Sequence, residues 1–163
     1  MRAVIRLLVL DVDGVLTDGR LYFGPRGEVL KVFHVRDGYG LVRLRRAGVE
    51  VAVISGRRSA MVRARCRELG IAHLYQGARD KLAVLTRLCA RLRVAPDACA
   101  CVGDDEPDLP LMRRVALSFA VADAHPSVRR AADVITRLPG GRGAVREVCD
   151  RLVARNARAR SAR

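Results

Sequence analysis

Short apolar runs alternate with amphipathic segments along most of the chain. The runs at residues 4–10, 49–54 and 98–102 predict buried strands, and shorter runs predict strands at 72–75, 117–121 and 133–135. Helical spacing of apolar residues predicts helices at 37–47, 59–69, 80–92, 108–114 and 144–154, with Asp37 as the cap of the first. This alternation predicts an α/β fold: a Rossmann-like, mostly parallel sheet with helices on both faces.

One segment departs from the alternation, directly after the first strand. Residues 21–23 and 29–33 are apolar arms around the turn sequence GPRG, so they predict a β-hairpin flap. The arms would expose Leu, Tyr, Val and Phe side chains to water unless another surface covers them.

The chain of 163 residues contains no internal repeat and no inter-domain linker. Residues 1–155 are expected to form a single domain, and 156–163 a basic, flexible C-terminal tail without periodicity. The first residues lack the features of a signal peptide, and no apolar run approaches the roughly 20 residues of a membrane span. The five cysteines are odd in number and lack C-x-x-C spacing. Together these features favour a cytoplasmic protein with reduced thiols and no membrane partner.

Polar side chains follow the predicted strands, where an open parallel sheet binds its ligands. They are Asp11, Asp13, Ser55, Gly56, Arg57, Lys81, Asp104, Asp105 and Asp108. Clustered carboxylates repel one another unless a cation lies among them, and Mg²⁺ prefers such oxygen ligands. An aspartate can attack phosphorus, while a lysine and a hydroxyl stabilise phosphoryl oxygens. The set therefore predicts a Mg²⁺-dependent phosphoryl-transfer site in which one of the aspartates is the nucleophile.

Each of these residues alone has an ordinary structural explanation. An aspartate after a strand is often a helix cap, Ser55-Gly56 is a common turn, and Lys81 could be a surface lysine. Their order after successive strands is what favours chemistry.

Four segments resemble the motifs of the haloacid dehalogenase superfamily of phosphatases. They are 11–18 (DVDGVLTD), 54–56 (ISG), Lys81 and 103–108 (GDDEPD), and the resemblance covers nearly the whole chain. The resemblance implies that Asp11 attacks phosphorus and that Asp13 protonates the leaving oxygen and then activates water. It implies Mg²⁺ ligands from Asp11, Asp104 and the Asp13 backbone carbonyl, with Asp105 and Asp108 orienting the metal water and Lys81. Phosphate oxygens would contact Ser55, Gly56 and Lys81.

Within the superfamily, segments 34–40, 73–77, 121–126 and 140–147 resemble the phosphatases of 3-deoxy-D-manno-octulosonate (KDO) 8-phosphate. This resemblance implies a phosphorylated sugar acid as substrate, a role in lipopolysaccharide precursor synthesis, and a homotetramer. His34 stands where that subfamily usually carries asparagine. The expected substrate-binding residues are Asp13, His34, Val35, Arg36, Asp37, Gly38, Ser55, Gly56, Arg57, Arg65 and Lys81.

Arginine is the natural receptor for the carboxylate of such an acid because its fork binds both oxygens. Arg57 and Arg65 are eight positions apart, so one helix would present both on the same face. They could equally be solvated arginines in a chain rich in this residue. Segment 140–143 could be a flexible flap or a plain loop before the last helix.

The intervals between the four motifs leave no room for a cap domain over the site. Without a cap the site would be open to water. Oligomerisation could close it, if the hairpins and tails of neighbouring subunits cover each site and exclude water.

Other functions remain open at this stage. A phosphatase of another sugar acid, such as a nonulosonate 9-phosphate, would use the same catalytic residues. The net charge of +14 suggests nucleic-acid binding, but only 4% of residues are aromatic and no nucleic-acid motif is present. A catalytically silent regulator would have no need for the complete catalytic set.

Overall fold

A computed structural model describes residues 4–161. Its main sheet has six parallel strands in the order β5-β4-β1-β6-β7-β8. These strands are β1 (Leu7–Leu10), β4 (Glu50–Ser55), β5 (His73–Gln76), β6 (Cys99–Gly103), β7 (Leu117–Ala120) and β8 (Val134–Ile135). β1 and β6 occupy the centre, where both faces of each strand are covered. Such strands need apolar side chains at every position, which explains their uninterrupted apolar runs.

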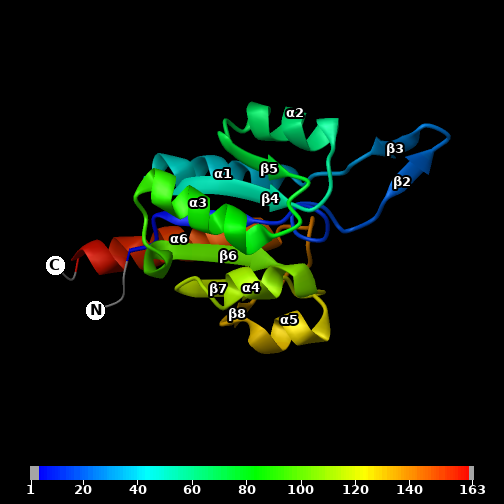
Figure 1. Ribbon diagram of the computed structural model, residues 1–163. Coiled ribbons are helices and arrows are strands. Elements are labelled where there is room, and N and C mark those ends of the chain that lie inside the picture. The colour runs from blue at the N-terminus through cyan, green and yellow to red at the C-terminus, as the bar shows by residue number, and fades with distance from the viewer. Residues whose placement is uncertain (1–3, 162–163) are drawn as a thin grey trace.

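Helices cover both faces of this sheet, as the alternation predicted. They are α1 (Val35–Arg46), α2 (Ala60–Glu68), α3 (Lys81–Leu92), α4 (Leu109–Met112), α5 (Pro126–Ala131) and α6 (Ala144–Ser161), with short 3₁₀ turns η1 (Pro96–Ala98) and η2 (Glu106–Asp108). α1 packs on α6 behind the strands in Figure 1, and α3 and α4 lie in front of them. α5 was not predicted, because a helix of six residues carries little apolar periodicity.

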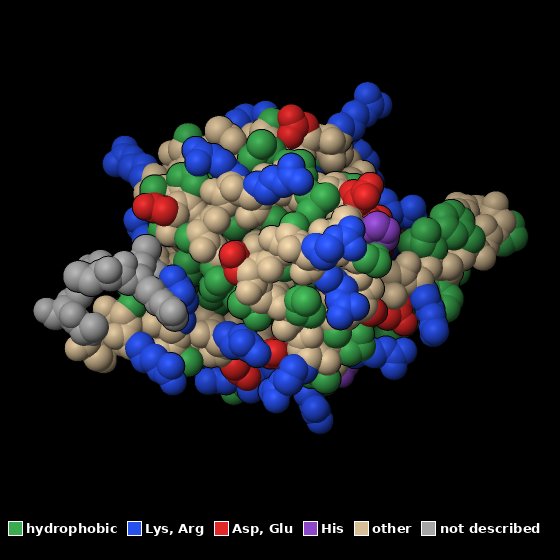
Figure 2. Space-filling model, turned by 90° about the horizontal axis from the view of Figure 1, so that it is seen from below, with side chains coloured by type: hydrophobic (Ala, Val, Ile, Leu, Met, Phe, Trp, Pro, Cys, Tyr) green, Lys and Arg blue, Asp and Glu red, His purple; other side chains and the backbone are tan. Residues whose placement is uncertain are grey.

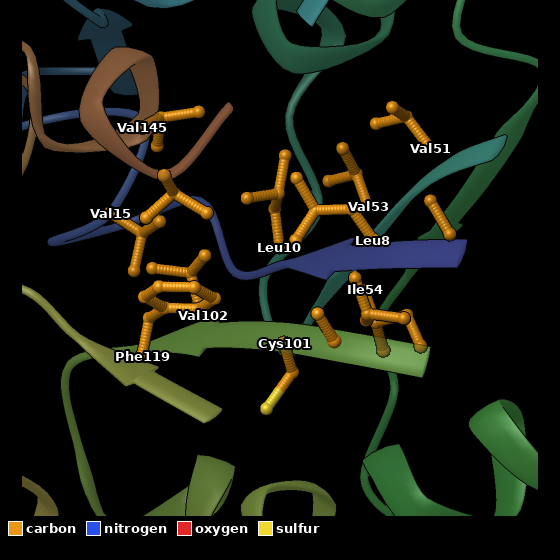
Figure 3. Close-up of a cluster of buried hydrophobic side chains, with 14 of the residues drawn as sticks. Leu8, Leu10, Val15, Val51, Val53, Ile54, Cys101, Val102, Phe119 and Val145 are labelled. Carbon is orange, nitrogen blue, oxygen red and sulfur yellow. The ribbon is translucent and has the colours of Figure 1, made fainter. Parts of the chain in front are cut away.

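The core is continuous between the sheet and the helices. Leu8 and Leu10 of β1, Val53 of β4, Val102 of β6 and Phe119 of β7 lie close together and are almost fully buried (Figure 3). Burying each such side chain stabilises the fold by about 1.5–3 kcal/mol. The core therefore fixes the strands whose ends carry the candidate site.

The predicted hairpin is present as β2 (Tyr22–Gly24) and β3 (Gly27–Leu30), paired antiparallel. It projects from the body at the right of Figure 1 and carries apolar side chains in Figure 2. Leu21, Phe23, Val29, Leu30 and Val32 are each at least 44% exposed. Within residues 4–161 no cap domain covers the sheet edge.

The last helix extends into the segment that was expected to be a C-terminal tail. α6 continues to Ser161 instead of ending near residue 154, while residues 162–163 of that tail lie outside the described part. Asn156 explains the extension, because its buried amide accepts a hydrogen bond from Ile5 N at 2.9 Å and donates one to Ile5 O at 2.8 Å. No helix in residues 4–161 has the length and apolar character needed to cross a membrane.

The expected cap of the first helix is also corrected. His34 is the N-cap of α1, with its Nδ1 accepting a hydrogen bond from Arg36 N at 3.2 Å. Asp37 lies inside the first turn and is 1% exposed. Its carboxylate accepts hydrogen bonds from Gly143 N at 3.2 Å and Arg146 N at 2.7 Å, and thus caps the distant helix α6.

Segment 140–143 is a packed loop rather than a free flap. Gly141 N donates to Val15 O at 2.9 Å, and Gly140 N donates to Asp123 Oδ1 at 2.9 Å. A Cβ on Gly140 would lie 1.7 Å from Gly14 O, so only glycine permits this approach. The loop therefore supports the segment that follows β1.

Candidate active site

The candidate site lies at the carboxyl ends of the central strands. Asp11 follows β1, Ser55 ends β4 and Asp104 follows β6. β1 pairs with both β4 and β6, so the three residues emerge side by side. Lys81, the first residue of α3, joins them from the neighbouring crossover. The structure thus brings these residues to one edge of the sheet, as their positions after successive predicted strands suggested.

Lys81 is a buried cation between two carboxylates. Its Nζ lies 3.0 Å from Asp11 Oδ1 and 2.7 Å from Asp108 Oδ1, and its side chain is 6% exposed. Burial alone would lower the pKa of Lys81, but Asp11 and Asp108 outweigh it and raise the pKa. The ammonium therefore stays charged beside the proposed nucleophile.

Asp108 uses both carboxylate oxygens within the protein. Oδ1 accepts from Lys81, and Oδ2 accepts from Asp104 N at 3.1 Å and Asp105 N at 3.5 Å. Together with Asp105 it forms a capping box at the start of η2. This arrangement supports the predicted orienting role for Asp108; the side chain of Asp105 instead caps η2 through Glu106 N.

The carboxylates fit a bound cation. Oxygen atoms of Asp11, Asp104 and Asp108 lie within 4.8 Å of one another. Asp104 Oδ1 is buried, and no residue in the described part of the chain donates a hydrogen bond to it. Burial, followed by the charges of neighbouring carboxylates, raises the pKa of Asp104 to about 8, and burial with Asp108 raises that of Asp11 to about 6. Because Asp108 is already engaged, Asp11 and Asp104 are the side chains best able to hold Mg²⁺.

Gly14 makes the close approach between the first motif and Asp104 possible. It adopts a positive φ of 88°, and a Cβ there would lie 2.0 Å from Asp104 Oδ2. Any other residue would both strain the backbone and displace this carboxylate. The glycine therefore keeps the loop containing Asp13 against the cation-binding side chain.

Asp13 points to the hairpin rather than to Lys81. Its carboxylate forms an ion pair with Lys31, while Arg57 Nε lies 3.6 Å from its Oδ2. Lys31 was not among the predicted site residues. The sequence did contain a feature that could have identified it: Lys31 lies in an otherwise apolar hairpin arm, in a chain with only one other lysine.

Ser55 and Gly56 lie where the second motif predicted them. The Ser55 side chain is almost fully buried and its Oγ accepts a hydrogen bond from Arg57 N at 3.3 Å. Gly56 is exposed at the end of β4, where its backbone N–H can reach a ligand.

The two arginines do not share a helix face, and that prediction was wrong. Ser59 is the N-cap of α2, so Arg57 precedes the helix whereas Arg65 lies within it. Arg65 pairs with Glu68 at 2.9 Å and stacks over Phe33. A small cavity nevertheless brings it together with His34 and Gly38.

The remaining predicted substrate residues differ in access. Val35 and Arg36 are exposed at the start of α1. Asp37 is buried and bonded to the backbone of α6, so its carboxylate is not presented to a ligand.

A parallel sheet that carries carboxylates, a lysine and a serine at one edge defines a class of protein. That class is the haloacid dehalogenase-like hydrolases. The family model of that description matches residues 70–140. KdsC of Escherichia coli strain K12, a 3-deoxy-D-manno-octulosonate 8-phosphate phosphatase, is 56% identical over 91% of this chain and 79% of its own. The chain therefore belongs to the family of 3-deoxy-D-manno-octulosonate 8-phosphate phosphatases.

Two solved structures of the family are similar to this fold. The enzyme from Yersinia pestis has a TM-score of 0.93 at 51% identity, covering 96% of this chain and 84% of that one. The enzyme from Moraxella catarrhalis, in complex with magnesium ion, phosphate ion and KDO, has a TM-score of 0.89 at 43% identity, covering 92% and 86%.

Proposed function

We propose that this protein is a Mg²⁺-dependent phosphatase that hydrolyses KDO 8-phosphate to KDO and phosphate, in lipopolysaccharide precursor synthesis. The observation that carries the proposal is the position of Asp11, which lies between the buried Lys81 ammonium and the Asp104 carboxylate at the ends of β1 and β6. The named substrate of the E. coli relative, and the ligands of the M. catarrhalis structure, support the choice of sugar acid.

The first step makes use of Asp11. One of its carboxylate oxygens attacks phosphorus, the bond from phosphorus to the sugar oxygen breaks, and Asp13 gives its proton to that oxygen. In the second step Asp13 takes a proton from water, whose oxygen attacks phosphorus and releases phosphate from Asp11. Lys81, Ser55 Oγ and the Gly56 N–H stabilise charge on the phosphoryl oxygens.

Mg²⁺ would be held by Asp11, Asp104 and the backbone carbonyl of Asp13. When bound, it neutralises negative charge on the phosphoryl group. Asp108 would hold Lys81 and the backbone of Asp104 in place, and Asp105 would contribute through the cap of η2.

The sugar acid would lie beyond the phosphate. Arg57 is exposed enough to reach its carboxylate, and the cavity beside His34, Gly38 and Arg65 offers a second contact region. Val35 and Arg36 lie exposed next to His34. Asp37 would act indirectly, by joining α1 to α6.

We also propose a homotetramer in the cytoplasm. The exposed apolar face of the hairpin needs a cover, and neighbouring subunits would close each site with it. All five cysteines are free and buried, which suits a reducing compartment. Sedimentation velocity should give four times the chain mass; a monomer at micromolar concentration would contradict this assembly.

A nonulosonate 9-phosphate is the alternative substrate, since only contacts beyond the phosphate would differ. A nucleic-acid role has little support, because basic side chains are scattered over the face in Figure 2 rather than gathered into one patch.

The test is Mg²⁺-dependent phosphate release from KDO 8-phosphate by the wild type and by Asp11→Asn. Removing the nucleophile should reduce kcat at least ~100-fold. The exposed Asp97→Asn is the matched control and should keep full activity. A fully active Asp11→Asn protein would overturn the mechanism, and faster turnover of a nine-carbon acid phosphate would overturn the substrate.

A further inference from the structure

Four charged side chains form a closed ring between the hairpin and the first motif. Lys31 Nζ pairs with Asp13 and lies 2.8 Å from Glu28 Oε1. Glu28 also lies 3.5 Å from Arg57 NH2, and Arg57 Nε returns to Asp13 at 3.6 Å. The ring therefore joins β3 to the loop after β1 and to the end of β4.

Lys31 is the most deeply buried member of the ring. Its side chain is 1% exposed, against 10% for Glu28, 18% for Asp13 and 42% for Arg57. Burying an ammonium is strongly unfavourable unless carboxylates compensate for it, and so is removing one partner of such a pair. Glu28 is in turn stabilised as a carboxylate. Burial opposes its ionisation, but the charges of Lys31 and Arg57 outweigh burial and lower the pKa of Glu28.

The two oxygens of Asp13 are engaged by different cations. Lys31 contacts Oδ1 on the hairpin side, while Arg57 approaches Oδ2 from the end of β4. Two contacts from different directions fix both the position of the carboxyl group and the rotation of its plane. Arg57 is half-exposed and its contact is long, so Lys31 makes the stronger contribution.

We propose that Lys31 is a positioning residue that orients the Asp13 carboxyl group for proton transfer to the leaving oxygen, and that Glu28 holds Lys31 in place. This inference rests on the proposed role of Asp13 as the acid and base. Glu28 and Lys31 belong to the hairpin, so the hairpin contributes to chemistry within its own subunit as well as to assembly.

If Lys31 orients Asp13, the rate loss on removing Lys31 should depend on how much the leaving group needs a proton. A sugar alkoxide leaves poorly unless it is protonated, and a positioned general acid typically contributes about 10²–10⁴-fold. A nitrophenolate leaves without a proton, so orientation of Asp13 matters little for its release. A displacement of about 1 Å in a positioned group can cost about 100-fold.

The experiment measures the single-turnover rate of alcohol release from KDO 8-phosphate and from p-nitrophenyl phosphate, with saturating Mg²⁺. Lys31→Met should slow release from the sugar phosphate at least ~10-fold and release of nitrophenolate less than ~3-fold. In a second measurement, with p-nitrophenyl phosphate in excess over enzyme, a nitrophenolate burst should be followed by slow steady turnover, because water activation also needs Asp13. Lys31→Arg should restore most of the sugar-phosphate rate, and Glu28→Gln should show the same selectivity more weakly.

Arg26→Met is the matched control, because Arg26 is an exposed cation in the turn of the same hairpin. It should leave both rates unchanged. Equal losses on the two substrates in Lys31→Met and Glu28→Gln, or no loss in either, would overturn the positioning role. The proposed function fails separately, if wild-type protein releases no KDO or if Asp13→Asn keeps the wild-type ratio of the two rates.

Discussion

Lys81 and Asp108 form a buried ion pair of 2.7 Å, and the second oxygen of Asp108 holds the backbone of Asp104. The Asp108 carboxylate thus holds both the Lys81 ammonium, which lies beside Asp11, and the loop that carries Asp104, a candidate metal ligand. Neither Lys81 nor Asp104 is positioned by the sheet alone.

Asp108→Asn should therefore impair metal binding and chemistry together. The amide keeps the size of the side chain but removes the charge that holds Lys81, so we expect about 10–100-fold losses in Mg²⁺ affinity and in kcat. Mg²⁺ titration of phosphate release measures both. Asp97→Asn, an exposed change of the same chemistry, should have no effect. Wild-type Mg²⁺ affinity in Asp108→Asn would contradict the orienting role.

The carboxylates should make stability depend on pH in the absence of metal. Burial and neighbouring charges raise the pKa of Asp104 to about 8 and of Asp11 to about 6. Between about pH 4 and those values the folded protein binds more protons than the unfolded chain, so its stability falls as pH rises. In EDTA, Tm should decrease from pH 6 to pH 8.

Mg²⁺ should reverse this trend, because it binds the ionised carboxylates and its binding releases protons. The increase in Tm on adding Mg²⁺ should grow from pH 6 to pH 8. Asp104→Asn should weaken both the fall in EDTA and the gain with Mg²⁺. An increase that is independent of pH would exclude Asp104 as the ligand.

Gly140→Ala should damage the site from a distance. A Cβ 1.7 Å from Gly14 O forces the first motif to move, so we expect lower kcat and a loss of at least about 1 kcal/mol from overpacking. Gly48→Ala is the control, since Gly48 has a φ of 84° but its nearest contact would be 3.8 Å away. It should cost about 1 kcal/mol of strain with normal kcat. Equal kinetic behaviour of the two variants would argue against support by residue 140.

Asn156→Ala should destabilise the protein although it lies in the basic C-terminal segment. It leaves the buried N–H and C=O of Ile5 without partners, and each unsatisfied group costs about 1–3 kcal/mol. Urea denaturation of the metal-bound protein measures the change. Arg158→Ala, at an exposed position two residues further on, should stay within about 0.5 kcal/mol of the wild type.

The sequence was sufficient to place Asp11, Ser55 and Asp104 together. Each lies at the end of a largely apolar run, and such runs are parallel strands whose carboxyl ends meet at one edge. Local turn residues likewise predicted the hairpin. These features depend on neighbours within a few positions, which a sequence pattern records directly.

Contacts between distant segments were not predictable in this way. The bonds from Asp37 to the start of α6 join positions 106 and 109 residues apart, and Lys31 meets Asp13 only because the hairpin folds back. The last helix was predicted too short because its final turns are rich in arginine. The pairing of Asn156 with Ile5 joins positions 151 residues apart, which a local pattern does not record.

The close approach of Gly140 to Gly14 has a consequence for synthesis: the loop after β1 cannot be fully packed until residue 140 has been made. The loop that carries Asp11 and Gly14 is made first, and the residues that support it, Gly140 and Gly141, are made more than 120 residues later. A nascent chain that ends before residue 140 can form β1 and its neighbours yet lacks the surface against which that loop rests. Phosphatase activity should therefore appear only after residues 140–141 have left the ribosome.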